Sequence, residues 1–368
     1  MEQNPYAARL GRVRERMRDR GIDVFILGPS PDLRYLTGCA LPADERPLFL
    51  VLPAEGPAFL LANLLYKPQV ETLPVEECIL WADGEDPFER LRGAVSRHGL
   101  SMDKAALEAR LPAAFSLPLA QSFPRAQFVL GTSLTAELRQ CKDEGELGRI
   151  RHASREADRI LKTVMDQGSY WLGRREADLA GALHALFREA RMEPWDAIVA
   201  VGENGAVPHH RTGDTLIQEG KGLIVDFGGW FQGYATDCTR TFFFGPPPEE
   251  FKRVYRIVLE AHLAAEAAAR RGNTLGDVDA AARRVIEQYG YGACFTHRTG
   301  HGIGLDIHEG ASASRGETSP IREGMVFSIE PGIYLPGRFG VRIENLVAVT
   351  KDGTEILHRF PRELRIYG

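Results

Sequence analysis

The chain has 368 residues, a formal net charge of -5 and 44% hydrophobic residues. It is long enough for two domains, each with its own apolar core, and its composition is ordinary for a globular enzyme. The negative net charge argues against a nucleic-acid partner. The five cysteines are scattered without a C-x-x-C pair, a pattern typical of reduced thiols in the cytosol.

The start of the sequence lacks the apolar segment that an export signal requires. No apolar stretch approaches the roughly 20 residues that cross a bilayer. We therefore expect a cytoplasmic protein with no membrane partner.

The first third of the sequence alternates short helical and strand patterns. Helical spacing is present over residues 6–20, and the apolar run at 24–27 ends at Gly28-Pro29. Two further apolar runs, at 48–52 and 58–61, are separated by Pro53 and Gly56. This alternation predicts a small α/β domain with a covered sheet over residues 1–135.

A long helix is predicted to open the second part of the chain. Asp143 followed by Glu146 forms a capping-box pattern, and apolar residues recur with helical spacing as far as Gly168. Further helices are predicted over 179–190 and 278–289, and strands at 198–201, 223–227, 239–244, 325–329 and 341–349. Clustered helices beside hairpin-connected strands predict an α+β domain over 136–368, after a boundary between 132 and 141.

Acidic residues occur in three segments where a predicted strand should be apolar. Ionised carboxylates are rarely buried unless they are paired or bind a metal. With the two-residue period of a strand, Glu330 shares a face with Ser328, and Glu344 shares one with Arg342. These polar faces predict a common cleft. The four acids are Asp226, Asp237, Glu330 and Glu344.

Histidines and glycines alternate between residues 297 and 309. Glycines on both sides of His301 let the backbone approach a site closely. Neither the spacing of a dinucleotide fingerprint nor that of a zincin histidine pair is present. The histidines are His297, His301 and His308, and the pair His209–His210 lies earlier in the chain.

Four carboxylates and one imidazole balance the charge of two divalent cations. Oxygen-rich ligation with a single imidazole suits manganese, cobalt, zinc or iron(II). Two such ions roughly 3.5–4 Å apart can ionise a shared water at neutral pH.

These segments resemble the pita-bread metallopeptidases, the family of Xaa-Pro dipeptidase (prolidase), aminopeptidase P and methionine aminopeptidase. The resemblance covers about residues 140–360, with a looser match before them. It implies a pita-bread catalytic domain behind a creatinase-like N-terminal domain, and two divalent ions per chain, with manganese favoured. Glu330 would also act as the general acid/base. The implied metal ligands are Asp226, Asp237, His301, Glu330 and Glu344.

The resemblance also implies roles for residues that do not bind metal. His297 and His308 would hydrogen-bond the substrate or stabilise the tetrahedral oxyanion, and His209 would contact the substrate. Arg342 matches a site arginine of the proline-specific members, so we expect it to orient the ligands. His210 departs from the pattern, because prolidase-like sequences often carry glycine there.

Members of this family usually dimerise so that the first domain of one copy caps the site of the other. We therefore expect a homodimer in which the first domain helps to select the substrate. Arg46 or Arg34 would bind the free carboxylate of a dipeptide, and Asp44 would help to bind its amine.

The predicted activity is metal-dependent hydrolysis of the Xaa-Pro bond in dipeptides, with proline-containing small peptides as the substrates. The first alternative is an Xaa-Pro aminopeptidase that acts on longer peptides. The non-enzyme alternative is a catalytically inert pita-bread interaction module, which the presence of all five ligand-type residues disfavours.

Overall fold

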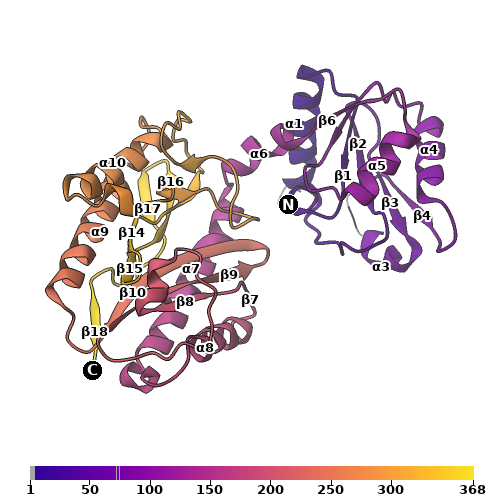
Figure 1. Cartoon of the computed structure of the whole chain (residues 1–368). Helices are drawn as coiled ribbons and strands as arrows, with labels where there is room; N and C mark the ends of the chain where they lie inside the picture. The colour runs from indigo at the N-terminus through magenta and orange to yellow at the C-terminus, as the bar shows by residue number, and fades with distance from the viewer. Residues whose placement is uncertain (1–4, 72, 74) are drawn as a thin grey trace. The chain divides into compact units, whose positions relative to one another are not determined.

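The computed structural model describes residues 5–71, 73 and 75–368. The chain forms two compact units, Met1–Arg139 and Gln140–Gly368. Figure 1 draws the first in indigo to violet and the second in magenta to yellow. Each unit has its own apolar core. None of the described helices is both long enough and apolar enough to cross a bilayer.

The N-terminal unit is built on one six-stranded mixed sheet with helices packed against it. The strand order is β4-β3-β2-β1-β5-β6, and β1 pairs antiparallel with β2 and parallel with β5. Its strands are β1 (Val24–Leu27), β2 (Phe49–Pro53), β3 (Phe59–Asn63), β4 (Glu77–Trp81), β5 (Lys104–Leu107) and β6 (Gln127–Leu130). Its helices are α1 (Pro5–Asp19), α2 (Pro31–Thr37), α3 (Lys67–Val70), α4 (Pro87–Arg97), α5 (Ala113–Ser122) and α6 (Thr132–Gln140), which ends at the boundary.

The C-terminal unit combines several mainly antiparallel sheets with two pairs of helices; only β10 and β18 pair in parallel among the described strands of this unit. Its helices are α7 (Glu144–Met165), α8 (Glu176–Glu189), α9 (Glu249–Ala268) and α10 (Leu275–Gln288). One sheet contains β7 (Glu193–Pro194), β8 (Ile198–Val201), β9 (Lys221–Phe231), β10 (Tyr234–Phe244) and β18 (Arg365–Tyr367). The others pair β11 (Gly300–His301) with β12 (Ser312–Ala313), β14 (Gly332–Leu335) with β15 (Phe339–Arg342), and β16 (Asn345–Thr350) with both β13 (Val326–Ile329) and β17 (Gly353–Ile356).

The fold class predicted from the sequence is confirmed in both units. The helix α7 begins with the predicted capping box, in which the Asp143 side chain accepts the Glu146 N–H and Glu146 reaches back to the Asp143 N–H. It ends at Met165, before Gly168. Gly168 instead starts a 3₁₀ turn with φ of 55°, a conformation that glycine adopts readily.

The single strand predicted over 341–349 is wrong. Here β15 ends at Arg342 and pairs with β14, whereas β16 starts at Asn345 and pairs with β13. Between them, the Glu344 N–H donates to the carbonyl of Thr239 on β10, at 3.0 Å. This long-range bond takes the chain from one sheet to the next, so Arg342 and Glu344 do not share one strand face.

Helix α9 was not predicted, although its buried positions have helical spacing. They include Phe251, Val254, Val258, Ala261 and Ala265. The helix packs beside α10 over the core that lies behind β13 and β15, and the two helices run along one side of the unit in Figure 1.

The β9–β10 hairpin is the longest pair of strands in the described part of the chain. Its turn residues Gln232 and Gly233 have φ of 50° and 87°, the combination of a two-residue type I′ hairpin. Such a tight turn sets the register, which pairs Asp226 with Thr239 and Gly228 with Asp237.

We expect Gly228→Ala to lower the free energy of unfolding by about 1–3 kcal/mol, the usual cost of overpacking a core. A Cβ at this position would lie 2.0 Å from the carbonyl oxygen of Thr236. In the matched control Gly148→Ala, on the exposed face of α7, the added Cβ meets nothing within 4 Å, so stability should rise by roughly 0.5–1 kcal/mol. Urea denaturation would measure both, and a Gly228→Ala protein as stable as the control would contradict the packing described.

Candidate metal centre

Two of the predicted acids face the same side of the β9–β10 hairpin. Paired residues of an antiparallel ladder project to one face, and Asp226 pairs with Thr239. Asp237 lies two residues before Thr239 on the same strand, so its side chain shares that face with Asp226. The hairpin register therefore places both carboxylates diagonally opposite each other.

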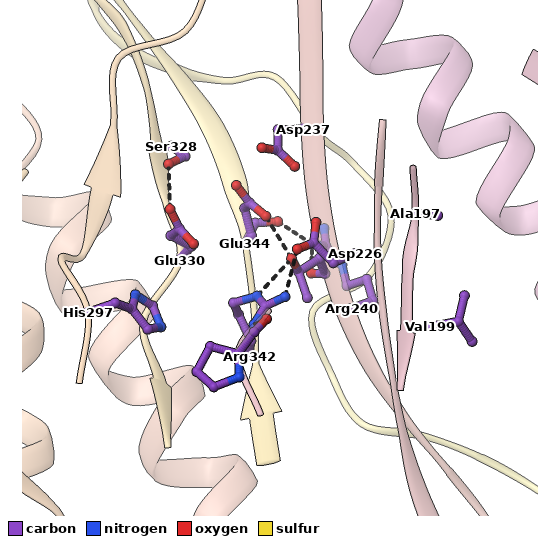
Figure 2. A network of polar contacts seen from close by, with 12 residues as sticks. Ala197, Val199, Asp226, Asp237, Arg240, His297, Ser328, Glu330, Arg342 and Glu344 are labelled. Atoms are coloured by element: carbon purple, nitrogen blue, oxygen red, sulfur yellow. Dashed lines mark hydrogen bonds and ion pairs between the residues drawn. The ribbon is translucent and has the colours of Figure 1, made fainter. Parts of the chain in front are cut away.

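The other two acids lie where strands end, on the facing side of the same gap. Glu330 follows β13 and its Oε1 accepts a hydrogen bond from Ser328 Oγ at 3.2 Å. Glu344 lies in the break between β15 and β16, and its Oε2 accepts from Thr239 Oγ1 at 2.7 Å. Figure 2 shows the four carboxylates directed toward one gap between the strands that carry them.

His301 completes this group from the short strand β11. Its Nε2 lies 3.6 Å from Asp237 Oδ2 and 3.4 Å from Glu330 Oε1. Gly300 allows the approach, because a Cβ there would lie 1.8 Å from the Ser328 carbonyl oxygen. The close backbone approach predicted for the glycines around His301 is thus present.

Several carboxylate oxygens in this group are buried without a hydrogen-bond partner among the described residues: Asp226 Oδ1, Asp237 Oδ1 and Glu344 Oε1. Burial raises the pKa of the Asp237 carboxyl well above its usual range, and the charges of Asp226 and Glu330 raise it further. The pKa of Glu344 is raised well above its usual range by burial and then by Asp237. Unpaired buried charges are costly, so these oxygens fit a role as cation ligands.

The donor set also fits a metal in its chemistry. Ligand atoms of Asp237, His301 and Glu344 all lie within 4.8 Å of one another. With Asp226 and Glu330 beside them, the set is oxygen-rich with one imidazole, which suits divalent ions of the first transition series. All five predicted metal ligands therefore converge on one place in the structure.

A hydrogen-bonded chain of side chains forms the neighbouring wall. The Arg342 guanidinium donates to Asp226 Oδ2 at 2.6 Å and to the Tyr334 hydroxyl at 2.9 Å. That hydroxyl lies 2.8 Å from His297 Nε2, and His297 Nδ1 lies 2.7 Å from the Arg298 carbonyl oxygen. Because a carbonyl only accepts, Nδ1 carries the proton and Nε2 accepts from Tyr334.

Burial favours the neutral forms of two groups in this wall, Tyr334 and His297. Burial raises the pKa of Tyr334 to about 12. Burial also lowers the pKa of His297, although the charge of Glu330 opposes this. Tyr334 was not predicted as a site residue. Its position could have indicated it, because Gly332 pairs with Arg342, and Tyr334, two residues further along β14, faces the same side.

The five predicted metal ligands, together with His297 and Arg342 of the wall, line one cavity of about 100 Å³. Pro208, His209, Arg298 and His308 complete its lining. The ring of His308 lies 4.2 Å from that of His301, and burial, followed by the charge of His301, lowers the pKa of His308 to about 4. All four of the predicted non-ligand site residues in this unit line the same cavity as the predicted metal ligands: His209, His297, His308 and Arg342.

The other three predicted site residues belong to the N-terminal unit. Arg46 makes two 3.0 Å bonds to Asp83. Asp44 Oδ1 accepts the Arg46 N–H at 2.8 Å, and its other oxygen contacts the Tyr66 hydroxyl. Arg34, in the last turn of α2, has no hydrogen-bond or ion-pair partner for its side chain in the described part of the chain.

A second cluster of ligand-type residues lies on the opposite face of β10. It contains Asp158, Cys238 and His358. His358 Nδ1 already pairs with Asp158 at 3.3 Å, and the Arg240 guanidinium lies 3.3 Å from Cys238 Sγ. The adjacent positive charge disfavours a cation there, so this cluster is a packed polar contact behind Asp237.

Comparison with known proteins assigns both units to families. Residues 148–351 match metallopeptidase family M24, and residues 9–141 match the creatinase/prolidase N-terminal domain. The probable dipeptidase PepE of Mycobacterium tuberculosis is 38% identical over 366 residues, 98% of this chain and 96% of the relative. An Xaa-Pro dipeptidase of Pyrococcus horikoshii is 31% identical over 357 residues, 96% of this chain and 97% of the relative.

Solved structures agree over nearly the whole chain. A dipeptidase from Pyrococcus horikoshii OT3 superimposes with a TM-score of 0.93 and 36% identity, covering 97% of this chain and 99% of that one. An X-Pro aminopeptidase from Thermotoga maritima MSB8 gives a TM-score of 0.82 and 30% identity, covering 95% and 99%. The resemblance inferred from the acid and histidine motifs is therefore confirmed. This chain belongs to metallopeptidase family M24, whose members use divalent metal, and carries a creatinase/prolidase N-terminal domain.

Proposed function

We propose that this protein is a cytoplasmic Xaa-Pro dipeptidase that uses two divalent ions, with manganese favoured. The observation that carries the proposal is the convergence of four carboxylates and one imidazole on one small cavity. Several relatives over the full length are dipeptidases or Xaa-Pro dipeptidases by name. The proposed ligands are Asp226, Asp237, His301, Glu330 and Glu344.

Divalent ions held by these five residues would supply Lewis-acid chemistry, which lowers the pKa of water and polarises a carbonyl oxygen. Glu330 then acts as the proton carrier. It takes a proton from the water and delivers it to the proline nitrogen, which has no hydrogen of its own and leaves only when protonated. Ser328 holds the Glu330 carboxylate in place through its 3.2 Å hydrogen bond.

The remaining cavity residues bind and orient. His308 and His209 are proposed to hydrogen-bond the peptide, and Arg342 holds Asp226 in its ligand orientation. His297 also lines the cavity, but both of its ring nitrogens have partners. A substrate group would therefore have to displace the Tyr334 hydroxyl to bond with His297.

The N-terminal unit, residues 1–135 as predicted, is proposed to form the homodimer contact and to select the peptide length. A dipeptide ends in a carboxylate at its proline. A cationic side chain without an acidic partner would bind that carboxylate and so favour dipeptides. Since Arg46 is already neutralised by Asp83, Arg34 is the better candidate for this contact. An Xaa-Pro aminopeptidase remains the second candidate, supported by the Thermotoga maritima structure.

Replacing Glu330 by Gln should reduce kcat on Ala-Pro by about 10²–10⁴-fold, because the carrier of the proton is lost. Metal content and melting temperature, measured on the same sample, show whether ligation or folding changed. Glu323→Gln, which alters an exposed ion pair with Arg271, is the matched control and should keep its activity. Normal turnover by the Glu330 variant would exclude this role.

Removing the metal with a chelator should abolish hydrolysis, and manganese or cobalt should restore it. Since the pKa values of Asp237 and Glu344 are raised in the metal-free protein, bound protons compete with the ions. The affinity for manganese should therefore fall as the pH is lowered, with protons released on binding. Calorimetry in two buffers of different ionisation enthalpy measures this release. A binding heat that does not depend on the buffer would contradict it.

The choice of substrate is tested by comparing Ala-Pro, Ala-Pro-Ala and Ala-Ala. We expect Ala-Pro to be cleaved with the highest kcat/KM and Ala-Ala to be cleaved poorly. Arg34→Ala should lower the ratio of the rate on Ala-Pro to the rate on Ala-Pro-Ala by about tenfold, as expected for a lost charge-assisted contact. Arg46→Ala should change this ratio less. A preference for Ala-Pro-Ala would favour the aminopeptidase, and an unchanged ratio in both variants would remove the arginines from substrate selection.

A further inference from the structure

The segment that presents His209 to the cavity has little regular structure. It runs from the end of β8 at Val201 to the start of β9 at Lys221, with one 3₁₀ turn over Gly202–Ala206. Most other lining residues of the cavity lie on strands or directly at strand ends. His209 is exposed on this loop, so its position depends on whatever holds the loop.

The loop is held by one fully buried carboxylate. Glu176, in the first turn of α8, has a side chain that is 0% exposed. Its Oε1 accepts the N–H of Val201 and the side-chain amide of Asn204, both at 2.8 Å. Its Oε2 accepts the N–H of Gly213 at 3.2 Å. One carboxylate therefore joins both ends of the 201–213 segment.

The fourth partner of Glu176 is His210, the neighbour of His209. His210 Nε2 lies 2.9 Å from Glu176 Oε2, and the side chain of His210 is 17% exposed. The carboxylate only accepts here, so Nε2 donates. On the other side, Arg342 donates to the carbonyl oxygen of Pro208 at 3.4 Å. The residues before and after His209 are thus each tied to a buried charge.

Without His210 the middle of the loop would lose its hydrogen bond to Glu176, whereas both ends of the loop would remain bonded to this carboxylate. The bonds from Val201 and Gly213 come from backbone N–H groups and do not depend on residue 210. Thr212 adds a further anchor, because its hydroxyl bonds the Ala197 carbonyl at 2.7 Å and the Val199 N–H at 2.8 Å. Val199 lies on β8, which pairs with the strand that carries Asp226, and Ala197 directly precedes β8 (Figure 2).

We propose that Glu176 and His210 form a clamp that fixes the position of His209 over the metal centre. Both are positioning residues, and neither lines the cavity. His210, at a position where prolidase-like sequences often carry glycine, therefore has a positioning role in this chain. The proposal rests on the proposed function, in which His209 binds the peptide. Misplacing a positioned group by about 1 Å can cost as much as 10²-fold in rate.

The test uses His210→Ala, which removes the donor, and His210→Gln, whose side-chain amide can replace Nε2–H. We expect His210→Ala to lower kcat/KM on Ala-Pro about tenfold. The loss should come from kcat and from KM in the same proportion as in His209→Ala. The Gln variant should recover most of the loss. In a His209→Ala background, His210→Ala should cost less than about twofold, because the two changes act on one interaction.

The matched control is His98→Gln. His98 forms the same kind of histidine–glutamate pair, 2.7 Å from Glu77 and 19% exposed, but in the N-terminal unit. The His98→Gln variant should have the same kcat/KM on Ala-Pro as the wild type. Metal content and melting temperature of every variant separate loss of fold from loss of positioning.

A readout without turnover distinguishes the clamp from the proposed function. Amide hydrogen exchange over residues 207–213 should be faster in the His210→Ala metal-loaded enzyme and should return to the wild-type rate with Gln. Unchanged exchange, unchanged kcat/KM, or an equal loss in the His209→Ala background would each overturn the clamp. If the wild type does not hydrolyse Ala-Pro but the hydrogen exchange of the variants changes as expected, the result supports the clamp and contradicts the proposed substrate.

Discussion

Electrostatic repulsion among the buried carboxylates is the constraint on which the catalytic unit depends. Asp226, Asp237, Glu330 and Glu344 surround one small cavity, and three of them have a buried oxygen without a hydrogen-bond partner in the described residues. Burial and mutual charge raise the pKa of Asp237 and of Glu344. Such a group is unfavourable in a folded protein unless cations bind to it, so metal loading and stability of this region are coupled.

The structure holds the acids and the substrate-facing groups in different ways. Asp226 and Asp237 lie on the longest hairpin, whose type I′ turn sets their register. Glu330 and Glu344 lie at strand ends that long-range backbone bonds fix to Thr299 and Thr239. His209, in contrast, lies on an irregular loop that relies on a buried charge. Metal ligands need fixed geometry, whereas a loop can present a side chain to a peptide that enters and leaves.

The chain Arg342–Tyr334–His297 connects these two groups of residues. It starts at the carboxylate of Asp226 and ends at a backbone carbonyl, and each of its hydrogen bonds has one defined direction. Because burial keeps Tyr334 and His297 neutral, the chain adds only the charge of Arg342 to the site. That single positive charge offsets part of the repulsion among the acids.

The sequence by itself determined the local elements and the chemical types of the site. An apolar run predicted the strand at 198–201, the Asp143–Glu146 pattern predicted the start of α7, and acids in otherwise apolar segments indicated the candidate metal ligands. These features depend on neighbours within a few residues, which a pattern can record. The fold class followed from the order of such elements.

Only the tertiary structure decided the features that depend on distant parts of the chain. The break at Glu344 follows from a backbone bond to Thr239, more than a hundred residues away, and neither residue's local sequence signals it. Tyr334 becomes part of the site because Arg342 and His297 meet at its hydroxyl. His210 acquires its partner from α8. Hydrogen bonds to buried groups are made wherever the fold brings a donor and an acceptor together, so sequence spacing alone could not reveal them.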